Sequence, residues 1–173
     1  MIRPVFRTSA FHVFPARLAH DGVPRQRPVR LFAPDPTPAA SNPMAAVRLV
    51  LAFDSEHANI LENAFAAKVA SAHLASSMQQ VFAALRLETP PTHLFLDHAW
   101  LRSEATRSKF EHEILPVCAR RGVKVLLFDL GKSAVEKITI STQTLSILPG
   151  TTGVPGLIAG FTQHVVEAQK PQT

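Results

Sequence analysis

The sequence predicts a single α/β domain in which helices cover both faces of a parallel five-stranded sheet. Three short apolar runs, each closed by an aspartate, are the first observation, and they end at Asp54, Asp97 and Asp129. Short runs rich in Val, Leu and Phe are typical of buried parallel strands. Segments of helical period separate these runs, which is the second observation, and such an alternation of strands and helices indicates a parallel sheet.

The first 43 residues predict an arm outside this fold. They hold eight of the fourteen prolines, six arginines and only two acids, and no apolar periodicity continues for more than a few residues. Arg30-Leu31-Phe32, followed by Ala33, resembles a matrix-processing site, which favours a mitochondrial transit peptide. Alternatively, translation starts at Met44 and residues 1–43 are a misassigned start. Either way, the predicted folded domain is residues 44–173.

The first half of this domain predicts two strands and two helices. The run 49–54 is the first strand, and an apolar stripe predicts a helix over about 56–68, capped by Ser55 or Asp54. Residues 69–75 alternate weakly and predict a small-residue strand. Ser76-Ser77 open the next helix, which ends before two consecutive prolines that cannot continue it.

Residues 93–129 predict the third strand, a long helix and the fourth strand. Residues 93–97 predict the third strand, and residues 103–121 are helix-forming, with a kink or an end expected at Pro116. Gly122 is a good helix stop before the fourth strand at 123–129.

The last part of the chain predicts the fifth strand and the closing helix. Residues 133–140 predict a short helix, although Thr139-Ile140 also suit a strand. Residues 144–148 predict a strand, and an apolar stripe from Val154 to Val165 predicts an amphipathic helix. Five strands in strict alternation with helices imply right-handed crossovers and the strand order 2-1-3-4-5, which is the flavodoxin-like layout.

Two segments resemble the receiver domain of two-component response regulators. Phe53-Asp54-Ser55-Glu56 stands where receivers carry an acidic pair, and Leu94-Phe95-Leu96-Asp97 resembles their phospho-acceptor strand. The resemblance implies that Asp97 is the phospho-acceptor of a phosphorelay. It also implies that Asp54 and Asp97 hold Mg²⁺, because carboxylate oxygens are its preferred protein ligands, and Asp129 is expected to supply a replacement ligand for the same ion.

Three departures from the receiver pattern weaken this chemistry. Ser55 fills the second acidic position, Asp129 stands near the place of a small hydroxyl, and Leu148-Pro149 replaces Lys-Pro. Phosphoryl transfer needs fixed donors for the phosphoryl oxygens, and one of them is missing here. We therefore expect a degenerate receiver, not an enzyme, that works in signal transduction by binding a protein partner such as a kinase or an effector.

The partner surface and the compartment follow from the same reasoning. Receivers usually present their fourth and fifth units, here 130–168, and this surface is also the one expected for a homodimer. The residues expected to shape it are Gly131, Leu145, Ile147, Val154 and Leu157. A cytoplasmic signalling module is the first expectation. A structural or assembly subunit of a larger complex in the mitochondrial matrix, delivered by a cleaved arm, is the alternative.

Composition excludes several other classes. Four of the five net positive charges lie in the arm, so the domain is nearly neutral and predicts no nucleic-acid partner. No apolar run is long enough to span a membrane. The single cysteine, Cys118, excludes an internal disulfide.

A small-molecule enzyme that holds an anion at the turn Gly150–Gly156 is a third functional alternative. Trp100 is expected to pack or to anchor a partner.

Overall fold

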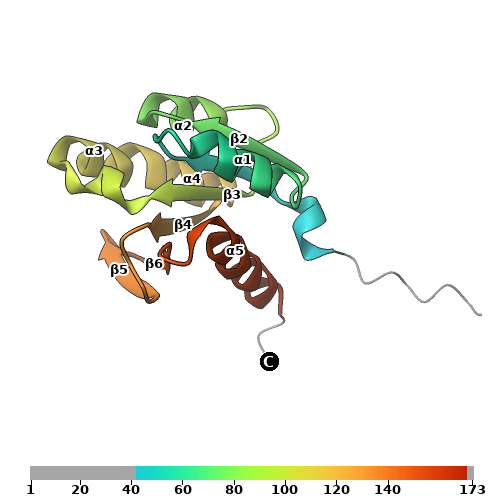
Figure 1. The fold of residues 1–173 in the computed structure, drawn as a ribbon. Coiled ribbons are helices and arrows are strands. Elements are labelled where there is room, and N and C mark those ends of the chain that lie inside the picture. The colour runs from blue at the N-terminus through green and yellow to red at the C-terminus, as the bar shows by residue number, and fades with distance from the viewer. Residues whose placement is uncertain (1–41, 171–173) are drawn as a thin grey trace, which may run out of the picture. The chain divides into compact units, whose positions relative to one another are not determined.

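A computed structural model describes residues 42–170, and a six-stranded sheet forms the centre of the domain (Figure 1). The strand order is β2-β1-β3-β4-β6-β5. All neighbouring strands are parallel except β5, which pairs antiparallel with β6 at one edge. The strands are β1 (Arg48–Ala52), β2 (Ser71–Ala75), β3 (His93–Asp97), β4 (Lys124–Asp129), β5 (Glu136–Ile140) and β6 (Gln143–Pro149).

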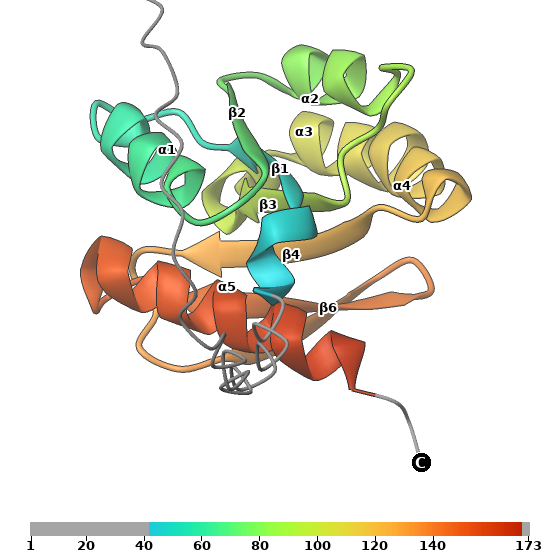
Figure 2. The same cartoon turned by 90° about the vertical axis from the view of Figure 1, so that its right-hand side faces the viewer.

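Helices cover both faces of this sheet (Figure 2). One hydrophobic cluster packs α2 and α4 against one face, and a second packs α1 and α5 against the other. The second cluster is rich in aromatic rings, with Phe95 of β3 in contact with Phe128 and Phe161. The helical segments are η1 (Pro43–Ala46), α1 (Ala58–Ala66), α2 (Met78–Leu85), η2 (His98–Arg102), α3 (Glu104–Lys109), η3 (Phe110–Ile114), α4 (Leu115–Arg121) and α5 (Gly153–Gln169).

The prediction of a doubly wound α/β fold is confirmed, but the predicted strand count and order are wrong. The cause is the segment 133–140, which is not a helix: residues 136–140 form β5 and pair with β6 through a turn at Ser141. The β-branched side chains of Ile138, Thr139 and Ile140 suit this extended state. The strict alternation of strands and helices therefore fails between β4 and β6, and an antiparallel hairpin strand is added at the edge.

The predicted helix 103–121 exists, and its distortion lies just before Pro116. It consists of α3, the π-helical turn η3 and α4. A proline inside a helix lacks an N–H and crowds the carbonyl four residues earlier, and a π turn relieves this conflict. His112 uses its Nδ1 to contact the carbonyl oxygen of Ser108 at 2.8 Å. Gly122 ends α4 in the left-handed conformation with φ of 67°, as predicted.

The described residues begin at Asn42, whose side chain accepts a hydrogen bond from the Met44 N–H and caps η1. Met44 is buried in the aromatic cluster. The arm predicted for residues 1–43, as a transit peptide or as a misassigned start, lies outside the described residues except for Asn42 and Pro43. No helix between residues 42 and 170 combines the length and the apolar character that crossing a membrane requires.

Candidate functional site at the carboxyl edge of the sheet

The carboxyl ends of β1, β3 and β4 lie at one edge of the sheet, because these neighbouring strands are parallel. Asp97 is the last residue of β3 and Asp129 the last residue of β4, and the register pairs Asp97 with Phe128. The two carboxylates are therefore neighbours and influence each other electrostatically. Asp54 follows the end of β1 by two residues and is exposed.

Asp97 acts as a helix cap. It is only 9% exposed, and its Oδ1 accepts a hydrogen bond of 2.9 Å from the N–H of Ala99, which caps the first turn of η2. Burial and the neighbouring charge of Asp129 raise the pKa of Asp97, although the Ala99 N–H favours the charged form. One oxygen of the predicted phospho-acceptor is therefore committed to holding the backbone of η2.

Asp129 is held by three partners. Its Oδ1 accepts a hydrogen bond of 2.9 Å from the Gly131 N–H. Its Oδ2 lies 3.1 Å from Nδ1 of His98 and 3.6 Å from the guanidinium of Arg102. Burial alone would raise the pKa of Asp129, but the hydrogen bonds from His98 and Gly131 and the charge of Arg102 outweigh it, so this pKa is lowered. Asp129 therefore stays ionised.

The three acids predicted to hold a metal ion, Asp54, Asp97 and Asp129, do not form a metal-binding cluster in the described residues. Among residues 42–170, no group of three or more His, Cys, Asp or Glu side chains is arranged to hold a metal ion. Asp97 and Asp129 use carboxylate oxygens on protein donors, and Asp54 does not join them in such a group. The structure thus brings together two of the three predicted acids and leaves the third on the surface.

Sequence reasoning missed His98 and Arg102 as partners of Asp129. Strand β3 ends at Asp97, and the chain then turns into η2. This turn directs His98 and Arg102 to the same carboxylate. One signal in the sequence could have indicated this arrangement. Asp97 ends a strand and can accept a hydrogen bond from the next turn, and His98 and Arg102 follow it by one and five residues.

Three of the five residues expected to shape a surface over 130–168 are buried. Leu145 is 6% exposed, and Ile147 and Leu157 are at most 1% exposed, because they belong to the two hydrophobic clusters. These three residues therefore lie in the core and not on the surface, whereas a partner or homodimer surface over 130–168 stays a prediction. Gly131 is exposed and Val154 is half-buried.

The turn Gly150–Gly156 does not present a free row of N–H groups. The Gly150 N–H donates to the Asp129 carbonyl at 2.9 Å, the Thr151 N–H to the Lys132 carbonyl, and the Gly153 N–H to the Gly150 carbonyl. Gly150 is required because a Cβ there would lie 2.7 Å from the Cα of Leu130. This turn therefore packs against the loop after β4, which leaves its first N–H groups unavailable to an anion.

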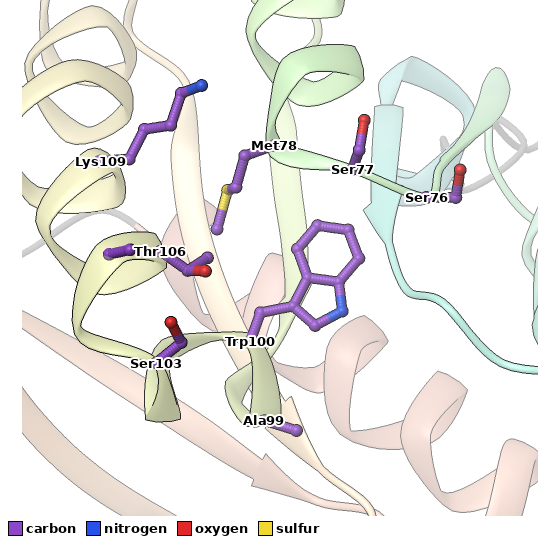
Figure 3. A pocket seen from close by; sticks show the side chains of 9 residues that line it. Ser76, Ser77, Met78, Ala99, Trp100, Ser103, Thr106 and Lys109 are labelled. Atoms are coloured by element: carbon purple, nitrogen blue, oxygen red, sulfur yellow. The ribbon is translucent and has the colours of Figure 1, made fainter.

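A groove of about 500 Å³ lies between the start of α2 and the segment from η2 to α3 (Figure 3). The half-buried Trp100 lies across it, with Met78 on one side. We call it the Trp100 groove, and the residues that line it are Ser76, Ser77, Met78, Ala99, Trp100, Ser103, Ala105, Thr106 and Lys109. Its position outside the carboxyl ends of β2 and β3 is where open α/β sheets place ligands.

The geometry defines a protein of the α/β class with a mostly parallel sheet and an apolar groove at its carboxyl edge. Comparisons with protein-family models, with curated proteins and with solved structures find no match. The resemblance to receiver domains therefore stays a prediction from the sequence of this chain.

Proposed function

We propose that this domain is a receiver-like, non-enzymatic signalling module that binds a protein partner in the Trp100 groove without phosphoryl transfer at Asp97. The observation that carries the proposal is the connection between the acidic pair and the groove. Asp97 caps η2, and η2 supplies Trp100 to the groove. In this arrangement the carboxylates position a binding surface.

The surroundings of Asp97 oppose the chemistry of a phospho-acceptor. Transfer to a carboxylate needs a cation and donors around the incoming phosphoryl oxygens. Here the neighbouring position, at the end of β4, carries the ionised Asp129, which would repel a phosphoryl group. The imidazole of His98 and the guanidinium of Arg102, which lie nearby, are both paired with Asp129. These contacts favour a structural role for both acids.

The Trp100 groove has the features of a protein-binding site. Buried tryptophans at the centre of an interface often supply much of the binding energy, and the ring edge of Trp100 is accessible in a pocket of suitable size. Hydroxyl groups of Ser77, Ser103 and Thr106 line the groove and offer hydrogen bonds. Lys109 is its one cationic lining residue.

A fluorescence titration tests the absence of phosphoryl chemistry. Trp100 is the only tryptophan and lies three residues after Asp97, so its emission reports directly on the acidic pair. We expect no saturable change when Mg²⁺ and beryllofluoride, a phosphoryl mimic, are added to the full chain. A saturable change that Asp97→Asn abolishes would show that Asp97 accepts a phosphoryl group and would refute this part of the proposal.

A second experiment separates the charge of Asp97 from its capping role. Asn keeps an oxygen that can accept the Ala99 N–H, whereas Ala does not. We expect the tagged full chain to keep its co-purifying partner in Asp97→Asn. Asp97→Ala and Trp100→Ala should reduce recovery of the partner at least about tenfold, since loss of a central aromatic anchor costs about 2 kcal/mol or more.

The matched control for this experiment is Ile60→Ala. Ile60 is an exposed large apolar residue on α1, on the face of the sheet opposite the groove, and is 56% exposed. Its replacement should leave recovery unchanged. Equal recovery with Trp100→Ala and with the native chain would exclude the groove as the docking site.

A further inference from the structure

A second groove, which we call the arginine groove, lies on the same helical layer between α2 and α4. It has a volume of about 430 Å³, and its lining includes Phe82, Arg86, Pro116, Val117, Arg120 and Arg121. His112 and Glu113, from the π-helical turn η3, complete its wall. Three guanidinium groups therefore border one cavity of a domain whose net charge is close to neutral.

None of these three arginines forms an ion pair with an acidic side chain of residues 42–170. The ion pairs of this part of the chain are His98 and Arg102 with Asp129 and Lys132 with Glu136. Glu113 lines the same groove, but it is not within ion-pair distance of a guanidinium. Three uncompensated like charges around one cavity attract an anion, because binding it relieves their mutual repulsion.

Two of the arginines are held in place by the protein itself. The guanidinium of Arg121 donates to the carbonyl oxygens of Leu85, at 2.9 Å, and of Leu87, at 2.6 Å. The guanidinium of Arg86 lies 4.1 Å from the centre of the Phe82 ring. Arg120 is exposed. Because these contacts fix the positions of Arg86 and Arg121, less side-chain entropy is lost when an anion binds.

We propose that the arginine groove binds an acidic segment of a polypeptide partner through Arg86, Arg120 and Arg121. The floor is apolar, from Val117, Pro116 and the edge of Phe82, and it suits an aliphatic side chain between two carboxylates. Carboxylates match the planar fork of a guanidinium.

Nucleic acid is a poorer match for the same groove. A base would stack on the face of Phe82, but the Arg86 guanidinium covers that face. The domain also lacks the long basic stripe that tracks a nucleic-acid backbone, since its positive and negative residues nearly balance.

This inference does not depend on the Trp100 groove, because the two grooves share no lining residue. They do share α2, whose first residue Met78 lines the Trp100 groove and whose Phe82 lines the arginine groove. One partner could therefore occupy both grooves along the seam between α2 and the segment α3 to α4.

Fluorescence polarisation with a labelled acidic peptide tests the proposal. The probe is fluorescein-Glu-Glu-Leu-Glu-Glu, and the protein is the full chain at low salt. We expect saturable binding that weakens several-fold, and at most about 25-fold, in the double variant Arg86→Gln/Arg120→Gln, since each exposed charge contributes up to about fivefold. Arg121 is left unchanged because it also bonds the backbone after α2. Raising the salt to about 0.3 M should weaken binding in the native chain, because salt screens exposed charges.

Two control variants make the outcome specific. Arg107→Gln removes an exposed arginine that lies outside the arginine groove, and it should bind the peptide as the native chain does. Trp100→Ala should also bind the peptide normally, which separates a failure here from a failure of the proposed function. The double variant should unfold at a temperature close to that of the native chain, because removal of like charges offsets the lost contact between Arg86 and Phe82.

Three results would overturn the proposal. The first is no saturable peptide binding even at low salt, and the second is equal binding by the native chain and the Arg86→Gln/Arg120→Gln variant. The third is tighter binding of a single-stranded oligonucleotide of the same net charge, which would identify the groove as a nucleic-acid site.

Discussion

Replacing His93 with leucine should make the domain markedly less sensitive to acid. His93 is a buried polar residue at the amino end of β3, and its side chain is only 6% exposed. Its Nδ1 lies 2.9 Å from the Thr92 hydroxyl. That hydroxyl already donates its proton to the Arg48 carbonyl, so the ring must be the donor, and Nε2 carries no proton.

The bare Nε2 is buried and has no hydrogen-bond partner among the described residues. The groups facing the ring are apolar or basic: Phe161 and His164 of α5, and Lys124 of β4. Burial first, and then the charges of Lys124 and His164, lower the pKa of His93 from 6.5 to about 4. A proton on Nε2 would place a positive charge in this site without a partner.

The size and sign of the effect follow from these two pKa values. Because the folded chain binds the proton more weakly than the unfolded chain, acid favours unfolding. Stability is fully present above pH 6.5 and is lost as the pH falls towards about 4. At about 1.4 kcal/mol per pH unit, the complete loss is about 3 kcal/mol, and at about pH 4.5 it is about 2.5 kcal/mol.

Urea unfolding at about pH 7 and about pH 4.5 measures the effect. At pH 7 we expect His93→Leu to differ from the native chain by no more than about 1 kcal/mol, because the lost Thr92 contact is offset by removal of an unpartnered buried nitrogen. At pH 4.5 the variant should gain about 2.5 kcal/mol relative to the native chain. An equal acid sensitivity of both chains, or the same gain in His73→Gln, which replaces an exposed histidine of β2, would refute the reasoning.

Three further substitutions test the edge of the sheet, each by urea or thermal unfolding. Ser141→Gly should stabilise the domain by about 0.5 to 1 kcal/mol, because Ser141 has a φ of 56°, and a loss of stability would contradict this. Gly150→Ala should cost about 2 kcal/mol or more, because the new Cβ would meet the Leu130 Cα; an unchanged midpoint would show that the loop yields. Asp129→Asn should cost about 1 to 2 kcal/mol near pH 7. Because the pKa of Asp129 is lowered in the folded chain, that difference should shrink as acid protonates the native carboxylate below its ordinary value of 3.8, and a constant difference would argue against the pairing with His98.

The central strands were predictable from the sequence because they are apolar on both faces. The predicted third strand coincides with β3, and the fourth differs from β4 by one residue. Helices pack on both sides of these strands, so nearly every position must be apolar, and the resulting run has few other interpretations. The end of α4 at Gly122 was also predictable, because glycine is the residue that most easily adopts the left-handed conformation at a helix end.

The edge strand β5 was not predictable in the same way. Its residues Glu136 and Lys137 are exposed, and only Ile140 is buried, so the segment carries little hydrophobic signal. Its extended state depends on pairing with β6, which is a tertiary contact and not a local preference. The charges on this outer strand also suit an edge that must not pair with another chain.

For the two carboxylates, strand order predicts that they are neighbours but does not predict what they do. Parallel neighbouring strands place Asp97 and Asp129 together whatever their role. Their roles depend on η2, whose turn directs the Ala99 N–H to Asp97 and directs His98 and Arg102 to Asp129. A strand-ending aspartate can bind a ligand or cap the next turn, and the sequence does not distinguish these outcomes.

The opposite pKa directions of these two acids have a structural explanation that also bears on function. Pairs of carboxylates with separated pKa values are typical of acid–base catalysis. Here the separation follows from unequal partners: Asp129 has the His98 imidazole, the Arg102 guanidinium and a backbone N–H, whereas Asp97 has one backbone N–H and a charged neighbour. A substrate that used Asp129 would have to displace His98 and Arg102, and one that used the bonded oxygen of Asp97 would uncap η2 and move Trp100. These contacts support the proposal that the acidic pair holds η2, and with it Trp100, in position.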